Sequence, residues 1–205
     1  MGTKKPLILR VLQETADRKD SIRRAAEALR NGSMVIMPTD TVYGVAVDPR
    51  VAGAEEKIFI AKSRDRGKPI PLLASGLDQV KRYGAELGVL ERKLAKKFWP
   101  GPLTLVLRVG AREEGFRVPD HDVALELLRA VGGILRVTSA NLSGEPPALT
   151  AEEAIRSLGD HVDVVLDAGK ALGETPSTVV RIVDGRVVIL REGAISAGEL
   201  SLLKA

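Results

Sequence analysis

Residues 178–190 read TVVRIVDGRVVIL, and this stretch decides which kind of sheet the chain forms. Two runs rich in β-branched residues, 178–183 and 186–190, flank Asp184-Gly185, a pair typical of a two-residue β-hairpin loop. A hairpin joins antiparallel strands, whereas the rest of the chain alternates helical and strand patterns, which favours parallel pairing. The sequence therefore predicts an α/β fold with a mixed sheet and flanking helices rather than a parallel barrel.

The remaining elements follow from hydrophobic periodicity and from residues that start or stop helices. The segment 20–31 carries apolar residues at helical spacing, and we expect Asp20 to be its N-cap. Thr150 and Glu153 form a capping-box pattern at the start of a helix over 151–158. Other expected helices are 52–61, 77–83, 87–98, 123–131 and a short one after Ser196, and other expected strands are 34–37, 70–74, 103–109, 134–137 and 162–166.

The composition suits a single domain over residues 1–205 and excludes several kinds of chemistry. No apolar run approaches the ~20 residues that cross a bilayer, and the N-terminal residues are too poor in apolar side chains for a signal peptide. We therefore expect a soluble cytoplasmic protein with no membrane partner. With no cysteine and 2 histidines, the chain cannot form disulfides, a thiol nucleophile or a His-rich metal site. The net charge of +4 suits an anionic ligand or RNA, and equally a solvated basic surface.

Two short polar clusters stand in apolar surroundings. Lys62-Ser63-Arg64 follows a predicted helix, and Arg66 and Lys68 add two more cations. The segment 138–144, TSANLSG, follows a predicted strand. Cations beside hydroxyl and amide groups suit a polyphosphate. Taken alone, however, the first cluster is more typical of a solvated basic loop, and the second is as typical of a Ser/Asn-rich turn.

Other polar residues occur at the ends of predicted strands. The segment 38–44, PTDTVYG, follows a buried strand, where open α/β sheets commonly bind ligands, although it also suits a simple turn. Arg117 lies in an apolar strand and needs an anionic partner, either a substrate or an internal carboxylate. Ser177 begins a strand and Arg191 ends one.

Taken together and in this order, these segments resemble the YrdC family of threonylcarbamoyl-adenylate synthases over about residues 20–193. The resemblance rests on the whole ordered set. Its segments are 38–44, Lys62-x-Arg64 with Lys68-Pro69, the sequence WPGPLT over 99–104, Arg117-Val118-Pro119, 138–144, Ser177–Val180, and Leu190-Arg191-x-Gly193.

The resemblance implies a twisted open mixed sheet with a basic concave cavity. It also implies an enzyme that condenses L-threonine, bicarbonate or CO2, and ATP into threonylcarbamoyl-AMP and pyrophosphate. A downstream tRNA-modifying transferase complex would use the product to make N6-threonylcarbamoyladenosine beside the anticodon. ATP is then a substrate, Mg2+ is expected with its triphosphate, and no metal site on the protein itself is expected.

The matching positions supply the expected site residues. Lys62 and Arg64 are the expected catalytic cations, since negative charge builds on the phosphates as pyrophosphate leaves. The expected ATP-binding residues are Lys62, Arg64, Lys68, Ser139, Asn141 and Arg191. The expected threonine-binding residues are Thr41, Tyr43, Arg117, Thr138 and Ser177.

The chain departs from the family pattern at one position, and two other functions stay open. Many family members carry a histidine where this chain has Leu73. YrdC-like domains also adenylate carbamoyl phosphate inside larger carbamoyltransferases, whereas this chain ends soon after the hairpin, as in the short single-domain form. A non-catalytic protein binding double-stranded RNA or tRNA is the third possibility, and it predicts a steep salt dependence and no ATP turnover.

Overall fold

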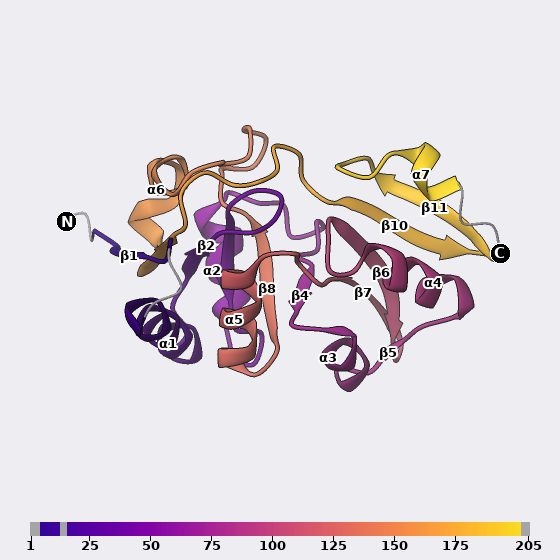
Figure 1. The fold of residues 1–205 in the computed structure, drawn as a ribbon, viewed down its shortest axis with the longest axis horizontal. Coiled ribbons are helices and arrows are strands. Elements are labelled where there is room, and N and C mark those ends of the chain that lie inside the picture. Colours follow the sequence, from indigo (N-terminus) through magenta and orange to yellow (C-terminus); the bar gives the residue numbers. More distant parts are fainter. Residues whose placement is uncertain (1–4, 13–15, 202–205) are drawn as a thin grey trace.

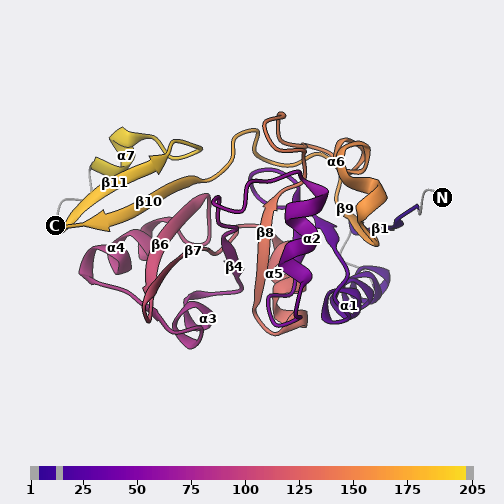
Figure 2. The same cartoon turned by 180° about the vertical axis from the view of Figure 1, so that it is seen from behind.

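The computed structural model describes residues 5–12 and 16–201, and it shows one long mixed sheet with helices packed around it (Figures 1 and 2). The strands are β1 (Leu7–Arg10), β2 (Val35–Met37), β3 (Gly44–Val47), β4 (Leu72–Ala74), β5 (Ala85–Glu86), β6 (Leu103–Val109), β7 (Arg112–Arg117), β8 (Ile134–Ser139), β9 (Val164–Asp167), β10 (Thr178–Val183) and β11 (Arg186–Arg191). The helices are α1 (Ala16–Arg30), α2 (Ala54–Ala61), α3 (Leu77–Arg82), α4 (Val89–Phe98), α5 (Asp122–Val131), α6 (Ala151–Leu158) and α7 (Ala197–Ser201), with a short 3-10 turn η1 (Gly159–His161).

The sheet confirms the predicted mixture of parallel and antiparallel pairing. Its strand order is β1-β9-β2-β3-β8-β4-β7-β6-β10-β11, and β5 pairs with β6 beside this path. The pairs β2–β3, β3–β8, β4–β8, β5–β6, β6–β7 and β10–β11 are antiparallel, and the others are parallel. At the β10–β11 hairpin, Asp184 and Gly185 both have positive φ, 49° and 71°, as a type I′ turn requires.

Three apolar clusters hold helices onto the sheet. The first part of the sheet consists of β1, β9, β2, β3 and β8. Helices α1 and α5 pack on one face of this part, and α2 and α6 pack on the opposite face (Figures 1 and 2). The second part consists of β7, β6, β10 and β11, and helices α3 and α4 pack on it and on β4. The short strand β4 joins the two parts of the sheet, since it pairs antiparallel with β8 and parallel with β7. No helix in the described ranges is long and apolar enough to cross a membrane.

The predicted start of the first helix is wrong, whereas the starts expected at 52 and 87 lie two residues before those of α2 and α4. Helix α1 begins at Ala16, so Asp20 lies inside the helix, where its carboxylate accepts a hydrogen bond of 2.6 Å from Arg23 one turn later. The extra turn is held by packing across the molecule: the buried side chain of Arg18 donates hydrogen bonds to Glu126 of α5, at 2.8 and 3.2 Å. Such a tertiary contact leaves no mark on local periodicity.

Candidate active site

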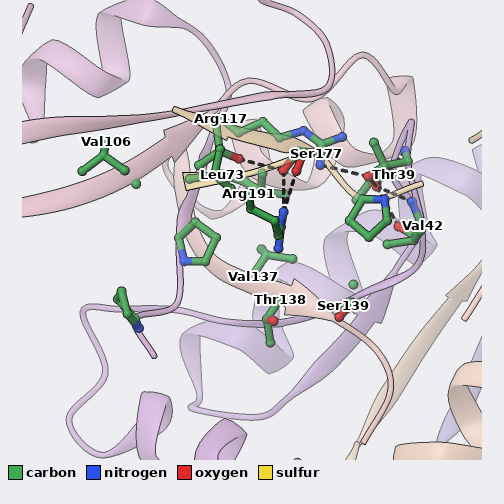
Figure 3. A pocket seen from close by; sticks show the side chains of 18 of the residues that line it. Thr39, Val42, Leu73, Val106, Arg117, Val137, Thr138, Ser139, Ser177 and Arg191 are labelled. Atoms are coloured by element: carbon green, nitrogen blue, oxygen red, sulfur yellow. Dashed lines mark hydrogen bonds between the residues drawn. The ribbon is translucent and has the colours of Figure 1, made fainter. Parts of the chain in front are cut away.

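A cavity of about 450 Å³ lies where β4 joins the two parts of the sheet, and both parts contribute to its wall (Figure 3). From the first part come the loop after β2 and the end of β8. From the second part come residues of β6, β7, β10 and β11. Eight of the residues expected from the sequence line this cavity: Thr41, Tyr43, Arg64, Arg117, Thr138, Ser139, Ser177 and Arg191.

Arg117, the last residue of β7, is fixed on three sides at one end of the cavity. Its Nε donates to the Gly101 carbonyl at 3.1 Å, one Nη donates to the Thr41 hydroxyl at 2.9 Å, and the other forms an ion pair with Asp40. The residue is only 6% exposed, and this burial lowers the pKa of its guanidinium against the opposing effect of Asp40. The sequence predicted an apolar strand around Arg117, but β7 is mostly polar; the anionic partner that this buried arginine requires is internal, Asp40. Arg117 also lines the cavity, where it can meet a second anion.

A second polar group lies across the start of β10. The Ser177 hydroxyl is 2.8 Å from the Thr104 hydroxyl, and Arg191 donates to the Ser177 carbonyl at 2.6 Å and to its hydroxyl at 3.2 Å (Figure 3). The three residues come from β6, the start of β10 and the end of β11, which the sheet order places side by side. Thr104 and Asp40 are polar residues of the site that sequence reasoning missed. Thr104 falls inside the WPGPLT segment, but an alternating strand gives no sign of which face is a ligand site.

Three arginines gather around the cavity from distant parts of the chain. Arg64 is held against the loop after α2, since its guanidinium donates to the carbonyls of Lys68 and Pro69 at 3.0 and 3.1 Å. Burial lowers the pKa of Arg191, and the charges of Arg117 and Arg64 lower it further. All three guanidinium groups also line the same cavity, so their positive charges act on one another there. A negatively charged ligand would relieve the repulsion, so the cavity suits phosphate and carboxylate groups.

Three expected ATP-binding residues lie off the cavity wall. Lys62 is 1% exposed, and its Nζ donates to the Ser139 carbonyl at 2.6 Å and to the backbone carbonyl of Asn141. The Asn141 amide in turn donates to the carbonyls of Leu142 and Glu145, at 2.9 and 2.7 Å. Lys62 and Asn141 therefore fix the loop that presents Ser139 to the cavity. The Lys68 side chain is exposed, and its backbone carbonyl accepts the hydrogen bond from Arg64.

The buried Lys62 amine should make the stability of the protein depend on pH. Burial, and to a smaller degree Arg64, lower the pKa of Lys62 to about 8 from its ordinary 10.5. The unfolded chain therefore holds this proton more tightly than the folded chain does between these two values, so stability should rise with pH in this window. We expect the free energy of unfolding of the wild type, relative to Lys62→Met, to increase by about 2 kcal/mol from pH ~7 to pH ~10. Urea titrations of both proteins across this pH range measure the two free energies of unfolding. If their difference did not change with pH, the lowered pKa of Lys62 would be contradicted.

Tyr43 contributes to the wall, but its hydroxyl is engaged elsewhere. That hydroxyl donates to the Gly169 carbonyl at 2.6 Å and accepts from the Ala168 amide at 3.1 Å, and burial raises its pKa to about 12. Leu73 lines the cavity, as do the prolines 69 and 71 and Val106. The cavity wall therefore includes apolar as well as charged side chains.

The carboxylates around the cavity do not form a metal site. Asp40 is paired with Arg117, and Glu113 pairs with Arg181 at 3.0 Å. Across residues 5–12 and 16–201, no group of three or more His, Cys, Asp or Glu side chains lies together in a way that could hold a metal ion.

Comparison with known proteins decides the family. The Sua5_yciO_yrdC family model, described as Telomere recombination, matches residues 27–193. The chain belongs to the Sua5/YciO/YrdC family. A Mycobacterium tuberculosis protein is 36% identical over 194 residues, which are 90% of this chain and 89% of that protein. The threonylcarbamoyl-AMP synthase of Chromohalobacter salexigens is 34% identical over 187 residues, covering 86% of this chain and 99% of that enzyme.

A solved family structure shows the same fold. Pyrococcus abyssi Sua5, crystallised with L-threonine, superposes with a TM-score of 0.89 at 30% identity. The match covers 96% of this chain and 60% of the longer P. abyssi chain. The YrdC-type fold expected from the sequence is therefore confirmed, and one member of the family with this fold binds an amino acid.

Proposed function

We propose that this protein is a threonylcarbamoyl-AMP synthase, which condenses L-threonine, bicarbonate or CO2, and ATP. The observation that carries the proposal is the convergence of Arg64, Arg117 and Arg191 on one cavity that also holds hydroxyl groups. A reaction between an amino acid and a nucleoside triphosphate needs separate cations for a carboxylate and for phosphates, and this cavity has both. Relatives that carry this activity in their names, over nearly their whole length, support the same conclusion.

The arrangement of the polar groups suggests how the substrates lie. The threonine carboxylate would meet Arg117 and Thr41, with Thr138 and Ser177 within the same wall. The triphosphate would lie along Arg64, Arg191 and Ser139. Mg2+ would enter with the triphosphate as part of the substrate. Lys62 and Asn141 would act through the Ser139 loop, and Lys68 would reach the phosphates from the exposed rim.

The reaction needs little more than positioning and charge. The threonine amine attacks CO2 and loses a proton, which gives a carbamate. A carbamate oxygen then attacks the α-phosphorus, the bond from that phosphorus to the oxygen bridging to the β-phosphate breaks, and pyrophosphate leaves. Negative charge grows on the leaving group, and fixed guanidinium groups stabilise it without reorganising. Holding the carbamate in line with the α-phosphorus supplies much of the remaining rate enhancement.

The product is a mixed anhydride that water destroys, so it must pass to a second enzyme. We propose that this is the tRNA-modifying transferase complex that attaches the threonylcarbamoyl group to adenosine beside the anticodon, in the cytoplasm. Direct contact with tRNA or double-stranded RNA would use exposed cations of the loop after α2, such as Arg66 and Lys68.

Pyrophosphate release from ATP tests the proposed function. We expect release to require both L-threonine and bicarbonate, measured with a coupled pyrophosphate assay. Release that depends on carbamoyl phosphate instead of threonine would identify the carbamoyl-adenylating reaction. Folded protein that releases no pyrophosphate but binds double-stranded RNA with a steep salt dependence would identify an RNA-binding protein.

A further inference from the structure

The connection from β9 to β10 crosses from one part of the sheet to the other, along the upper side of the molecule in Figure 1. We call residues 168–177 of this connection the strap. The strap is attached at both ends. At its start, the Tyr43 hydroxyl bonds to the Gly169 carbonyl and the Ala168 amide. At its end, Ser177 is bonded to Arg191 and Thr104. Its two ends therefore meet the two parts of the sheet that form the cavity.

The middle of the strap lies directly on the residues that hold Arg117. A Cβ atom at Gly173 would stand 2.7 Å from the Asp40 carbonyl oxygen and 2.9 Å from both the Cα and the carbonyl oxygen of Thr41. These distances are shorter than any ordinary carbon contact, so only glycine lets the two backbones approach this closely. Gly173 is not among the residues with positive φ. Its small size is needed for space and not for backbone conformation.

Other contacts make the strap a fixed part of the structure. The Ala171 amide donates to the Leu149 carbonyl at 2.7 Å, and the Ala171 side chain is buried in the cluster around α2 and α6. Near the far end, the Pro176 carbonyl accepts from the Ala194 amide at 3.0 Å. A strap held at these points keeps Gly173 against the backbone of Asp40 and Thr41.

We infer that the strap positions the threonine end of the cavity, with Gly173 setting the place of the Asp40–Thr41 backbone and Tyr43 holding the strap in register. Both are positioning residues that act through the Thr41–Arg117 contact of 2.9 Å. This inference rests on the proposed function, because it assigns the Arg117 end of the cavity to threonine. It gives Tyr43 a task different from direct contact through its hydroxyl.

The phosphate side of the cavity does not depend on the same contact. Arg64 is held by the loop carbonyls of Lys68 and Pro69, and Ser139 is held by the loop that Lys62 fixes. Arg191 is bonded to Ser177, at the end of the strap and four residues beyond Gly173. Moving Asp40 and Thr41 should therefore disturb threonine more than ATP. A general loss of folding would weaken both substrates alike, so the comparison separates positioning from stability.

The test is Gly173→Ala, with steady-state kinetics for each substrate. We expect KM for threonine to rise at least about tenfold while KM for ATP changes less than about threefold, because a small displacement of a binding group is costly. The matched control is Gly76→Ala: Gly76 has an extended φ of 168°, a Cβ there meets nothing within 4 Å, and it lies outside the cavity wall. This control should behave as wild type.

Tyr43→Phe tests the other attachment without adding volume. It removes the two hydroxyl hydrogen bonds to the strap and keeps the ring, so we expect a rise of about three- to tenfold in KM for threonine. If both residues act through one strap, the effects of the double variant will be non-additive. If Gly173→Ala fails to fold, Tyr43→Phe alone decides.

Each result has one meaning. Wild-type KM for threonine in the folded variants, or equal rises for threonine and ATP, would overturn the strap as a positioning element. A wild-type protein that releases pyrophosphate without threonine would instead overturn the proposed function, and the strap inference with it. Threonine-dependent wild-type turnover with a selective loss in both variants supports both.

Discussion

Replacing Arg117 with lysine should lower kcat/KM for threonine about 100-fold, mainly through a higher KM. Lysine keeps the positive charge beside Asp40, but a point charge cannot donate to Gly101, Thr41 and Asp40 at once as the guanidinium fork does. The threonine carboxylate would then meet a cation drawn toward Asp40. KM for ATP should change much less, because the phosphates are assigned to Arg64 and Arg191.

The matched control is Arg136→Lys. Arg136 is 7% exposed, against 6% for Arg117, and it also forms a buried ion pair, with Glu114 at 2.6 Å. It does not line the cavity. Both variants should lose stability, but only Arg117→Lys should lose threonine affinity. Equal kinetic effects in the two would show that Arg117 acts through stability alone, and calorimetric titration with threonine provides an independent reading.

The second large effect is expected at Arg64. Replacing it with alanine should lower kcat/KM for ATP about 100-fold, as removal of one fixed donor to a developing negative charge does in other enzymes. The Arg64 guanidinium is held by two carbonyls and faces the cavity, so its charge is pre-oriented toward the ligand. Pyrophosphate release at several ATP concentrations measures the loss.

Arg66→Ala is the control for this experiment. Arg66 lies on the same loop, is exposed, and pairs with Glu56 instead of lining the cavity. Its removal changes the net charge by the same amount, and activity should stay within about threefold of wild type, since exposed ion pairs contribute little. If the two alanine variants lose activity to the same degree, the basic loop acts only as a diffuse charge.

Local signals predicted much of the fold correctly. The strand over 103–109 has the bounds expected from its pattern. The 151–158 helix is capped by Thr150, whose hydroxyl accepts from the Glu153 amide at 3.2 Å. In both cases the information lies within a few residues of the element. The hairpin at Asp184-Gly185 was predictable for the same reason, since its turn imposes positive φ on both residues.

Other elements depended on distant contacts. Strand β3 follows directly on the 38–44 segment, and its residues are all buried, so no alternation marks it as a strand. Most of β7 is polar. Its Glu114 can be buried because Arg136 of β8 neutralises it inside the protein. The sequence could not show this pairing, which joins strands on either side of β4.

The site was predictable in its residue types and less so in its geometry. The ordered motifs identified eight residues that line the cavity, because each sits at a strand end or in a loop beside one. They did not show that the Lys62 amine faces backbone carbonyls, nor that Arg117 already has Asp40 as a partner. A motif records which residues are present, whereas the groups that each side chain faces depend on how the strands are ordered in the sheet.

The most direct test of the central claim is to identify the product. Purified protein is incubated with ATP, L-threonine and isotopically labelled bicarbonate, and the reaction is examined by mass spectrometry. We predict a compound that contains AMP, threonine and the labelled carbon, formed in step with pyrophosphate. Formation of pyrophosphate with AMP alone, or with no labelled carbon joined to threonine, would contradict the account.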